Sequence, residues 1–315
     1  MDSDLMENLS PVFILGMPRS GTTMLASMLA KIENVYATPE SQFIQWLINT
    51  EESTFSLDKE SIATKLLNDF QFKTYDLSLS HKNLVSLIGS NAVATICNIV
   101  KEYAHRKNED SFTWIEHTPE NYIYAHQLLE QFPSAKFIII TRDPRGCFES
   151  HKKIFWGEKS IQKFCYMWSH SNHCALAFLS KYPQRCMKVQ YETLLDNPES
   201  NLSELLSFID VDNVKSTKTY KIPTFTKSQH SLVNKPLDRT KKTSWQHSLS
   251  IKEINFIEYR LYSIMPFYGY NPTQKDKILS NPLNFFEIVF DSINGILLKI
   301  TGRIRRKYVR KELRN

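Results

Sequence analysis

The sequence lacks the features that place a chain in or across a membrane. None of its apolar runs reaches the ~18 uninterrupted apolar residues that a membrane-spanning helix needs. The first ten residues, MDSDLMENLS, contain neither the basic segment nor the apolar segment of a secretory signal peptide. We therefore expect a cytoplasmic protein without a signal peptide or anchor, whose only contact with a membrane is peripheral.

Cysteine is scarce and shows no pattern. There are five cysteines in 315 residues, an odd number, and their spacing is not that of metal ligands. We therefore predict no metal site and a reducing compartment. The cysteines are Cys97, Cys147, Cys165, Cys174 and Cys186.

The body of the chain has no excess of charge of either sign. The formal net charge is +6, and residues 302–315 alone contain seven Lys or Arg and one Glu, so the basic balance belongs to this tail. We expect no nucleic-acid partner. Residues 282–300 carry an apolar stripe at three- and four-residue steps, which predicts an amphipathic helix. This helix either lies on an anionic membrane surface beside the basic tail or packs on the core or in a homodimer.

Residues 11–29, PVFILGMPRSGTTMLASML, have the pattern of a strand, a turn and a helix. The apolar run 12–15 predicts a buried strand, Gly16 and Pro18 end it, and apolar residues at helical spacing follow from Met24. This arrangement aims free backbone N–H groups and the positive end of a helix at an anion. We therefore predict a site for a phosphate or a similar group.

The turn differs from a P-loop in one residue that matters. Gly16, Gly21 and Thr23 fit the P-loop pattern, but Thr22 stands where that pattern has its lysine. The cation is instead Arg19, whose planar guanidinium suits a tetrahedral oxyanion. A nucleotide kinase that uses a triphosphate remains an alternative, although the missing lysine speaks against it.

A second strand–turn–helix block, residues 136–150, reads KFIIITRDPRGCFES. Together, GMPRSGTT and this block resemble the sulfotransferases that use 3′-phosphoadenosine 5′-phosphosulfate (PAPS). The resemblance implies that Arg142 and Ser150 bind the 3′-phosphate of PAPS, and that 3′-phosphoadenosine 5′-phosphate is the product. It also implies a 5′-phosphosulfate loop made of Arg19, Ser20, Gly21, Thr22 and Thr23.

Strands alternate with helices along the chain, which predicts an α/β fold with a P-loop-like parallel sheet and helices on both faces. With 42% hydrophobic residues, the chain can form one sizeable core. We expect a single domain with helical insertions over residues 1–272, and an amphipathic helix with the basic tail over 273–315. Within the domain we expect one long helix over 81–105, another over 194–209, and a loop over 215–250 that closes on the nucleotide.

Two residues are candidates for the general base that transfer to a hydroxyl requires. Glu40 lies twenty-one residues after Arg19, and the tyrosylprotein and heparan-type branches of the family have a glutamate at about this distance. His117, in Glu116-His117-Thr118-Pro119, stands where those branches have a lysine that contacts the sulfuryl group. Cytosolic sulfotransferases have their basic histidine in a His-x-Pro motif at the same place. The sequence does not decide between Glu40 and His117 as base, and Arg19 is expected to stabilise the transferring group.

The resemblance carries over more loosely to later positions. Tyr191 matches a tyrosine that helps to hold the adenosine end, and Lys241 or Lys242, with Arg239 beside them, lie where the family has a basic residue on the nucleotide phosphates. The sequence thus predicts a PAPS-dependent sulfotransferase with a hydroxyl acceptor: a carbohydrate, a peptide tyrosine, a lipid or a small molecule. A non-catalytic nucleotide-binding protein on a membrane is a further alternative.

Overall fold

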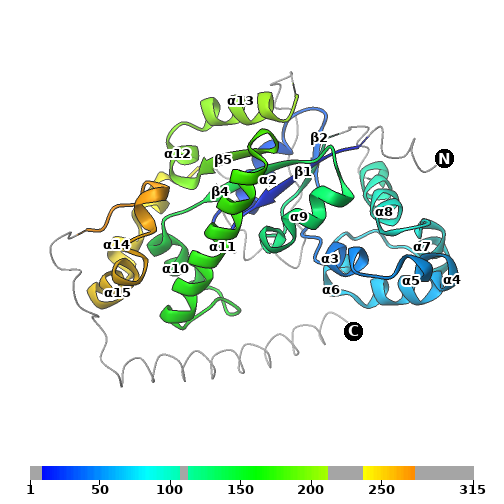
Figure 1. Cartoon of the computed structure of the whole chain (residues 1–315), viewed down its shortest axis with the longest axis horizontal. Helices are drawn as coiled ribbons and strands as arrows, with labels where there is room; N and C mark the ends of the chain where they lie inside the picture. Colours follow the sequence, from blue (N-terminus) through cyan, green and yellow to red (C-terminus); the bar gives the residue numbers. More distant parts are fainter. Residues whose placement is uncertain (1–8, 107–112, 212–236, 274–315) are drawn as a thin grey trace.

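A computed structural model describes residues 9–106, 113–211 and 237–273 (Figure 1). At its centre is a five-stranded sheet in the order β2-β3-β1-β4-β5. Every pairing in it is parallel. The strands are β1 (Ser10–Leu15), β2 (Val35–Ala37), β3 (Thr113–Glu116), β4 (Lys136–Thr141) and β5 (Cys186–Gln190).

Both faces of the sheet are buried, as the uninterrupted apolar runs predict. Because side chains alternate along a strand, Phe13 and Leu15 of β1 enter one hydrophobic cluster, and Val12 and Ile14 enter another. Helices cover the two faces, so the predicted α/β fold with a parallel sheet is confirmed.

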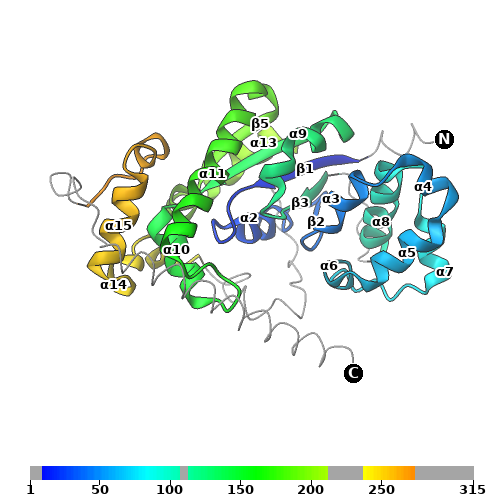
Figure 2. The same ribbon diagram turned by 60° about the horizontal axis from the view of Figure 1, so that its bottom comes forward.

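The helices fall into three groups in chain order. The first group follows β1 and β2 and includes the inserted α3–α8, and the second group flanks β4 and β5 in the sequence. The third group, near the end of the described chain, lies at the end of the molecule opposite α4–α8 (Figure 2). The first group is α2 (Thr22–Leu29), α3 (Phe43–Ile48), α4 (Glu52–Leu57), α5 (Lys59–Asn68), α6 (Phe70–Lys73), α7 (His81–Leu87) and α8 (Ala92–Arg106). The second is α9 (Asn121–Gln131), α10 (Pro144–Lys153), α11 (Ile161–Lys181), η1 (Pro183–Arg185), α12 (Tyr191–Asp196) and α13 (Pro198–Phe208). The third is η3 (Arg239–Lys242), α14 (Trp245–Ser248), α15 (Ile251–Leu261) and η4 (Met265–Tyr268).

The prediction of one long helix over 81–105 is wrong, because the chain breaks into α7 and α8 at Gly89. A β-carbon there would lie 2.5 Å from the β-carbon of Ala94, so the close turn requires glycine. Asn91 then starts α8 by accepting the Ala94 N–H at 2.9 Å. The helix predicted over 194–209 is likewise divided, since Pro198 occupies the first turn of a new helix, α13.

Part of the sequence predictions lies outside the described residues. These are the tail 274–315 and most of the loop 215–250, so the domain boundary at 272 stays a prediction. Within the part of the chain that the structure describes, no helix combines the length and the apolar character needed to cross a bilayer.

The order of the strands locates the functional edge of the sheet. The helix after β1, α2, packs in the cluster with Val12, whereas α11, which follows β4, packs in the cluster with Phe13. The connections that follow these two strands therefore lie on opposite faces of the sheet, and β1 and β4 are neighbours in it. Ligands in such sheets bind at this switch point, beyond the carboxyl ends of the strands.

Candidate active site

The turn after β1 adopts a backbone that few residue types allow. A β-carbon on Gly16 would lie 2.8 Å from the carbonyl oxygen of Ile140 in β4, so only glycine fits there. Arg19 and Gly21 have positive φ angles of 74° and 106°. Positive φ is costly for arginine, and such strained residues are concentrated at functional sites.

The turn leads directly into α2, which starts at Thr22. Gly21 is the N-cap and has no side chain to accept a hydrogen bond from the first-turn amides. These amides, including those of Thr22 and Thr23, are therefore available to an anion at the positive end of the helix. The backbone geometry of the predicted loop is therefore one that can hold an anion.

Arg19 joins this turn to the one after β4. Its Nε donates to Ser150 Oγ at 3.0 Å, and its carbonyl accepts from Arg142 Nη1 at 3.1 Å. Burial and then the charge of Arg142 lower the pKa of Arg19. The structure therefore brings Arg142 and Ser150 to Arg19, which lies more than a hundred residues before them in the chain.

Arg142 also contacts Tyr191 and the backbone of Lys241 in η3. Its guanidinium lies 4.2 Å from the centre of the Tyr191 ring, and its Nη2 donates to the Lys241 carbonyl at 3.3 Å. The Tyr191 ring packs on Gly21, where a β-carbon would lie 2.7 Å from it. The candidate site beside the start of α2 is therefore lined by an aromatic ring and a buried guanidinium.

Two polar atoms of the candidate site beside the start of α2 fit an anionic ligand. Ser20 Oγ and Arg142 Nε are buried and have no hydrogen-bond partner among the described residues. A buried polar atom without a partner costs about 1–3 kcal/mol, and a phosphate or sulfate oxygen would satisfy both kinds of donor. The close approach of two guanidiniums is repulsive unless an anion lies near them. The residues therefore fit a ligand with more than one phosphate-like group.

The three basic side chains within residues 239–242 each contact a nearby group of the protein. Arg239 donates to the carbonyls of Leu195 at 3.2 Å and Asp196 at 3.1 Å, which end α12. Lys242 pairs with the Asp196 carboxylate, and Lys241 Nζ lies 3.6 Å from Asp238. In this structure it is thus the backbone of Lys241, through Arg142, that reaches the site.

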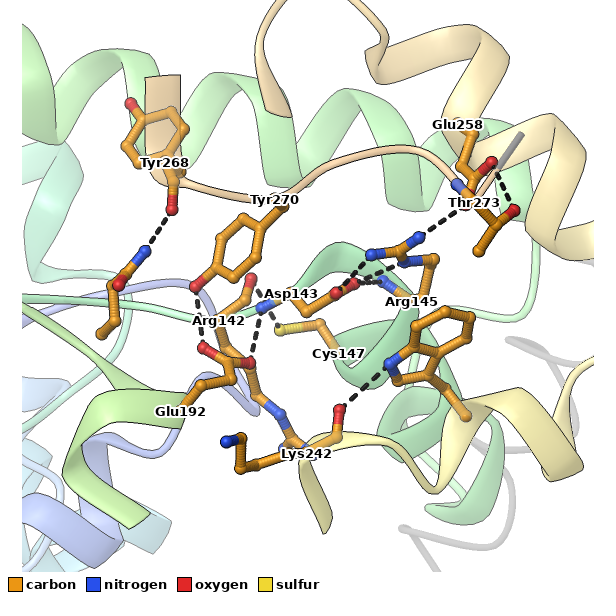
Figure 3. A network of polar contacts seen from close by, with 12 residues as sticks. Arg142, Asp143, Arg145, Cys147, Glu192, Lys242, Glu258, Tyr268, Tyr270 and Thr273 are labelled. Carbon is orange, nitrogen blue, oxygen red and sulfur yellow. Dashed lines mark hydrogen bonds and ion pairs between the residues drawn. The ribbon is translucent and has the colours of Figure 1, made fainter. Parts of the chain in front are cut away.

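A buried ion network holds the turn after β4 in place (Figure 3). Arg145 binds both oxygens of Asp143, at 2.9 and 2.7 Å, and its Nη1 donates to Glu258 of α15 at 2.5 Å. Its guanidinium also lies 4.0 Å from the Trp245 ring centre. Glu258 also accepts two hydrogen bonds from Thr273, one from its backbone N–H and one from its hydroxyl, each at 3.0 Å. These bonds hold the last described residue in place.

A second connection in Figure 3 runs through Glu192. This carboxylate accepts the Asp143 N–H at 3.0 Å and the Tyr270 hydroxyl at 2.9 Å. Sequence reasoning missed Arg145, Glu192 and Glu258. Only the proximity of Asp143 and Arg145 to Arg142 could have hinted at them, because their partners come from distant segments.

A group of carboxyls, Glu40, Glu116 and Glu120, lies at and just after the ends of β2 and β3. Glu116 is fully buried and accepts hydrogen bonds from Ser41 N–H at 3.2 Å, from the Thr118 hydroxyl at 2.5 Å and from Asn121. It therefore ties the segment after Glu40 to the turn that contains His117. In the described residues, no group of His, Cys, Asp or Glu is arranged to hold a metal ion.

The two predicted base candidates have opposite pKa shifts. Burial, followed by the charges of Glu120 and Glu116, raises the pKa of Glu40 from 4.5 to about 8, although Arg19 partly opposes the shift. Burial lowers the pKa of His117 from 6.5 to about 4. At neutral pH, His117 is thus a neutral imidazole, and Glu40 is a carboxyl poised to lose or gain a proton.

Comparison with known proteins agrees with this geometry. The sequence model described as "Sulfotransferase family" matches residues 11–215. A protein-tyrosine sulfotransferase from Drosophila melanogaster is 26% identical over 208 residues, which cover 64% of this chain and 38% of that protein. The nodulation protein NoeE from Sinorhizobium fredii is 21% identical over 276 residues, which cover 78% of this chain and 62% of that protein. The chain thus spans less than two thirds of these curated relatives.

The solved structures agree at the level of the fold. The sulfotransferase domain of the Synechococcus PCC 7002 olefin synthase superposes with a TM-score of 0.60 at 19% identity, covering 84% of this chain and 96% of that one. The family match includes the turn after β1, the block around Arg142 and the strand before Tyr191, and it covers well over half of the chain. The protein belongs to the sulfotransferase family.

Proposed function

We propose that the protein is a PAPS-dependent sulfotransferase that transfers the sulfuryl group to a hydroxyl acceptor. The observation that carries this proposal is the convergence of Arg19, Ser150 and Arg142 beside the start of α2. Two separate anion-binding elements suit a donor with a phosphate at each end of its ribose. A kinase is not favoured, because Thr22 cannot supply the charge of the P-loop lysine.

Each element holds one part of the donor in this proposal. The amides of residues 21–23, the Ser20 hydroxyl and the Arg19 guanidinium hold the 5′-phosphosulfate, while Arg142 and Ser150 hold the 3′-phosphate. Tyr191 borders the adenosine end, because its ring already stacks on Arg142. PAPS supplies an activated sulfuryl group, and the residues supply position and charge.

Glu40 is the proposed general base. Its pKa of about 8 is close to a physiological operating pH, where a base is most effective. It is also close enough to Arg19 for the two charges to influence one another. In the transfer, Glu40 accepts the proton of the acceptor hydroxyl as the new S–O bond forms. The bond from sulfur to the 5′-phosphate oxygen breaks, and Arg19 stabilises the negative charge that develops on that oxygen.

His117 takes a different part in this proposal. Its low pKa makes it a neutral hydrogen-bonding group rather than a cation or a strong base. It is buried next to Glu116, which holds its turn in place. We therefore assign to His117 the orientation of the acceptor hydroxyl.

The relatives support a choice of first acceptor. Several of them are named protein-tyrosine sulfotransferases, so a peptide tyrosine is the first hydroxyl to test. Carbohydrate, lipid and small-molecule hydroxyls complete the panel. A neutral His117 and a carboxylate base fit the deprotonation of any of these hydroxyls.

The test is the binding of nucleotides to the full chain by calorimetry. We expect 3′-phosphoadenosine 5′-phosphate to bind about 10- to 100-fold more tightly than adenosine 5′-phosphate, because charge-assisted bonds to the 3′-phosphate are lost in the latter. Equal affinities would reject the proposal, and tight metal-dependent binding of ATP would favour the kinase. Transfer of labelled sulfate from PAPS to the acceptor panel then tests turnover.

A further inference from the structure

His151 is a buried histidine of α10 that lies next to the predicted donor site but has no place in the proposed chemistry. Its side chain is 1% exposed. Its Nε2 lies 3.0 Å from the carbonyl oxygen of Pro18, in the turn after β1, and its Nδ1 lies 3.0 Å from the backbone nitrogen of Glu158. One imidazole thus bridges two segments that are far apart in the sequence.

These partners determine the state of the ring. The Glu158 backbone nitrogen can only donate, so Nδ1 accepts, and the Pro18 carbonyl can only accept, so Nε2 carries the proton. The ring is therefore a neutral imidazole. Burial lowers the pKa of His151 to about 4, and the charges of Arg19 and Lys159 act in the same direction, whereas the hydrogen bond to Pro18 and the charge of Glu158 oppose the shift.

The bond to Pro18 acts on the most strained residue of the donor loop. Arg19 follows Pro18 and has a φ of 74°. The peptide groups on both sides of Arg19 are anchored, since the Pro18 carbonyl accepts from His151 and the Arg19 carbonyl accepts from Arg142 at 3.1 Å. If the backbone of Arg19 left this conformation, its side chain would point in another direction. The two anchors therefore determine where the guanidinium lies.

The bond to Glu158 acts on the segment after α10, which brings Trp156 near Arg19. Lys159 holds this segment against the end of α10 by donating to the carbonyls of His151 at 2.8 Å and Ile154 at 2.6 Å. Within it, the Trp156 ring lies edge-on to His151, with 6.3 Å between the ring centres, and 6.0 Å from the Arg19 guanidinium. His151 therefore contacts both the turn that carries Arg19 and the Trp156 ring that lies near the Arg19 guanidinium.

We propose that His151 is a positioning residue for sulfuryl transfer: by bridging Pro18 and Glu158, it holds the left-handed backbone of Arg19 and aims its guanidinium at the 5′ end of the donor. This inference rests on the proposed function, because it assumes that Arg19 binds the 5′-phosphosulfate. His151 itself touches no substrate in it.

Two conservative variants separate the bonds of His151. His151→Gln can place an amide nitrogen near the position of Nε2 and keep the donor to Pro18. His151→Asn can place an amide oxygen near the position of Nδ1 and keep the acceptor for Glu158, but it does not reach Pro18. We expect His151→Asn to weaken binding of 3′-phosphoadenosine 5′-phosphate about tenfold, the scale of one charge-assisted hydrogen bond, and His151→Gln to stay within about threefold of wild type.

A double-mutant cycle tests whether the effect passes through Arg19. The affinities of wild type, His151→Asn, Arg19→Ala and the double variant are measured by calorimetry on the full chain. Since His151 acts through Arg19, the double variant should bind within about twofold of Arg19→Ala alone. Thermal unfolding of each variant is recorded alongside, because a general loss of stability would affect the Gln and Asn variants alike.

The outcomes are distinct. Equal affinities of the Gln and Asn variants, or additive losses in the cycle, would overturn the role of His151 while leaving the proposed function intact. If the Asn variant does not fold, a loss well beyond threefold in the Gln variant overturns it instead. If wild type itself fails to bind the nucleotide, the proposed function is rejected, and the role of His151 with it.

Discussion

Replacing Glu40 by glutamine should make the protein more stable while removing its turnover. The carboxyl of Glu40 is partly buried, and its pKa is raised from 4.5 to about 8 by burial and by the neighbouring carboxyls Glu120 and Glu116. The folded protein thus retains a proton that the unfolded chain has already lost. Between these two pH values, ionisation of Glu40 favours the unfolded state, so stability falls as pH rises.

The size of the effect follows from the shift. One pKa unit corresponds to about 1.4 kcal/mol, and pH 7 lies 2.5 units above the unshifted pKa of 4.5 but still below the raised value, so the upper limit at pH 7 is about 3.5 kcal/mol. Glu40 is partly exposed, so water screens its charge. We therefore expect Glu40→Gln to raise the free energy of unfolding by about 1–3 kcal/mol at pH 7–8 and to change it very little near pH 4.5. Glutamine resembles the protonated carboxyl in shape, so packing is retained.

The assay is urea denaturation of both proteins between pH 5 and pH 9, with turnover measured in parallel. Glu33→Gln, the same substitution at an exposed position, is the matched control. Parallel stability curves for wild type and Glu40→Gln would refute the raised pKa. Near-wild-type turnover in Glu40→Gln would show that the base is elsewhere, with His117 the first candidate.

Three further outcomes are expected. Arg142→Ala should weaken binding of 3′-phosphoadenosine 5′-phosphate by about 10- to 100-fold but change that of adenosine 5′-phosphate much less, as measured by calorimetry; equal losses would contradict a contact with the 3′-phosphate. Arg145→Ala should lower the free energy of unfolding by about 3–5 kcal/mol in urea, because Asp143 and Glu258 would remain buried without their partner, and a change below about 1 kcal/mol would contradict this. Turnover should rise with pH through about 8 and have no inflection near 6.5, because His117 is neutral above about pH 4; a rate profile governed by a group near 6.5 would reverse the assignment.

The membrane and localisation predictions remain separate from these tests. The amphipathic stripe over 282–300 and the basic tail lie outside the described residues, so peripheral membrane contact, a homodimer and a cytoplasmic location stay predictions. Sedimentation of the full chain with anionic vesicles, against a chain truncated before Pro282, tests the first of them. Binding that salt does not weaken would contradict an electrostatic contact.

The fold class and the turn after β1 could be predicted from short stretches of sequence. The strand before Gly16, the turn and the start of α2 are encoded within a few consecutive residues, since local periodicity and glycine placement dictate them. The same holds for β4 and the start of α10, where Pro144 occupies the first turn and Asp143 caps it. The sequence also identified Arg19, Arg142 and Ser150, which the structure brings into contact.

The contacts and the charge states of these residues became visible only in the folded chain. The pKa values of Glu40 and His117 depend on burial and on carboxyls from other segments, which no local pattern contains. The break at Gly89 depends on the close approach of Ala94, and the helix periodicity on either side concealed it. Arg145 and His151 act through partners brought together by folding, Glu258 and Pro18, each more than a hundred residues away in the chain. Hydrogen bonds and desolvation depend on distance in space, so sequence spacing could propose the site's residues but not their electrostatics.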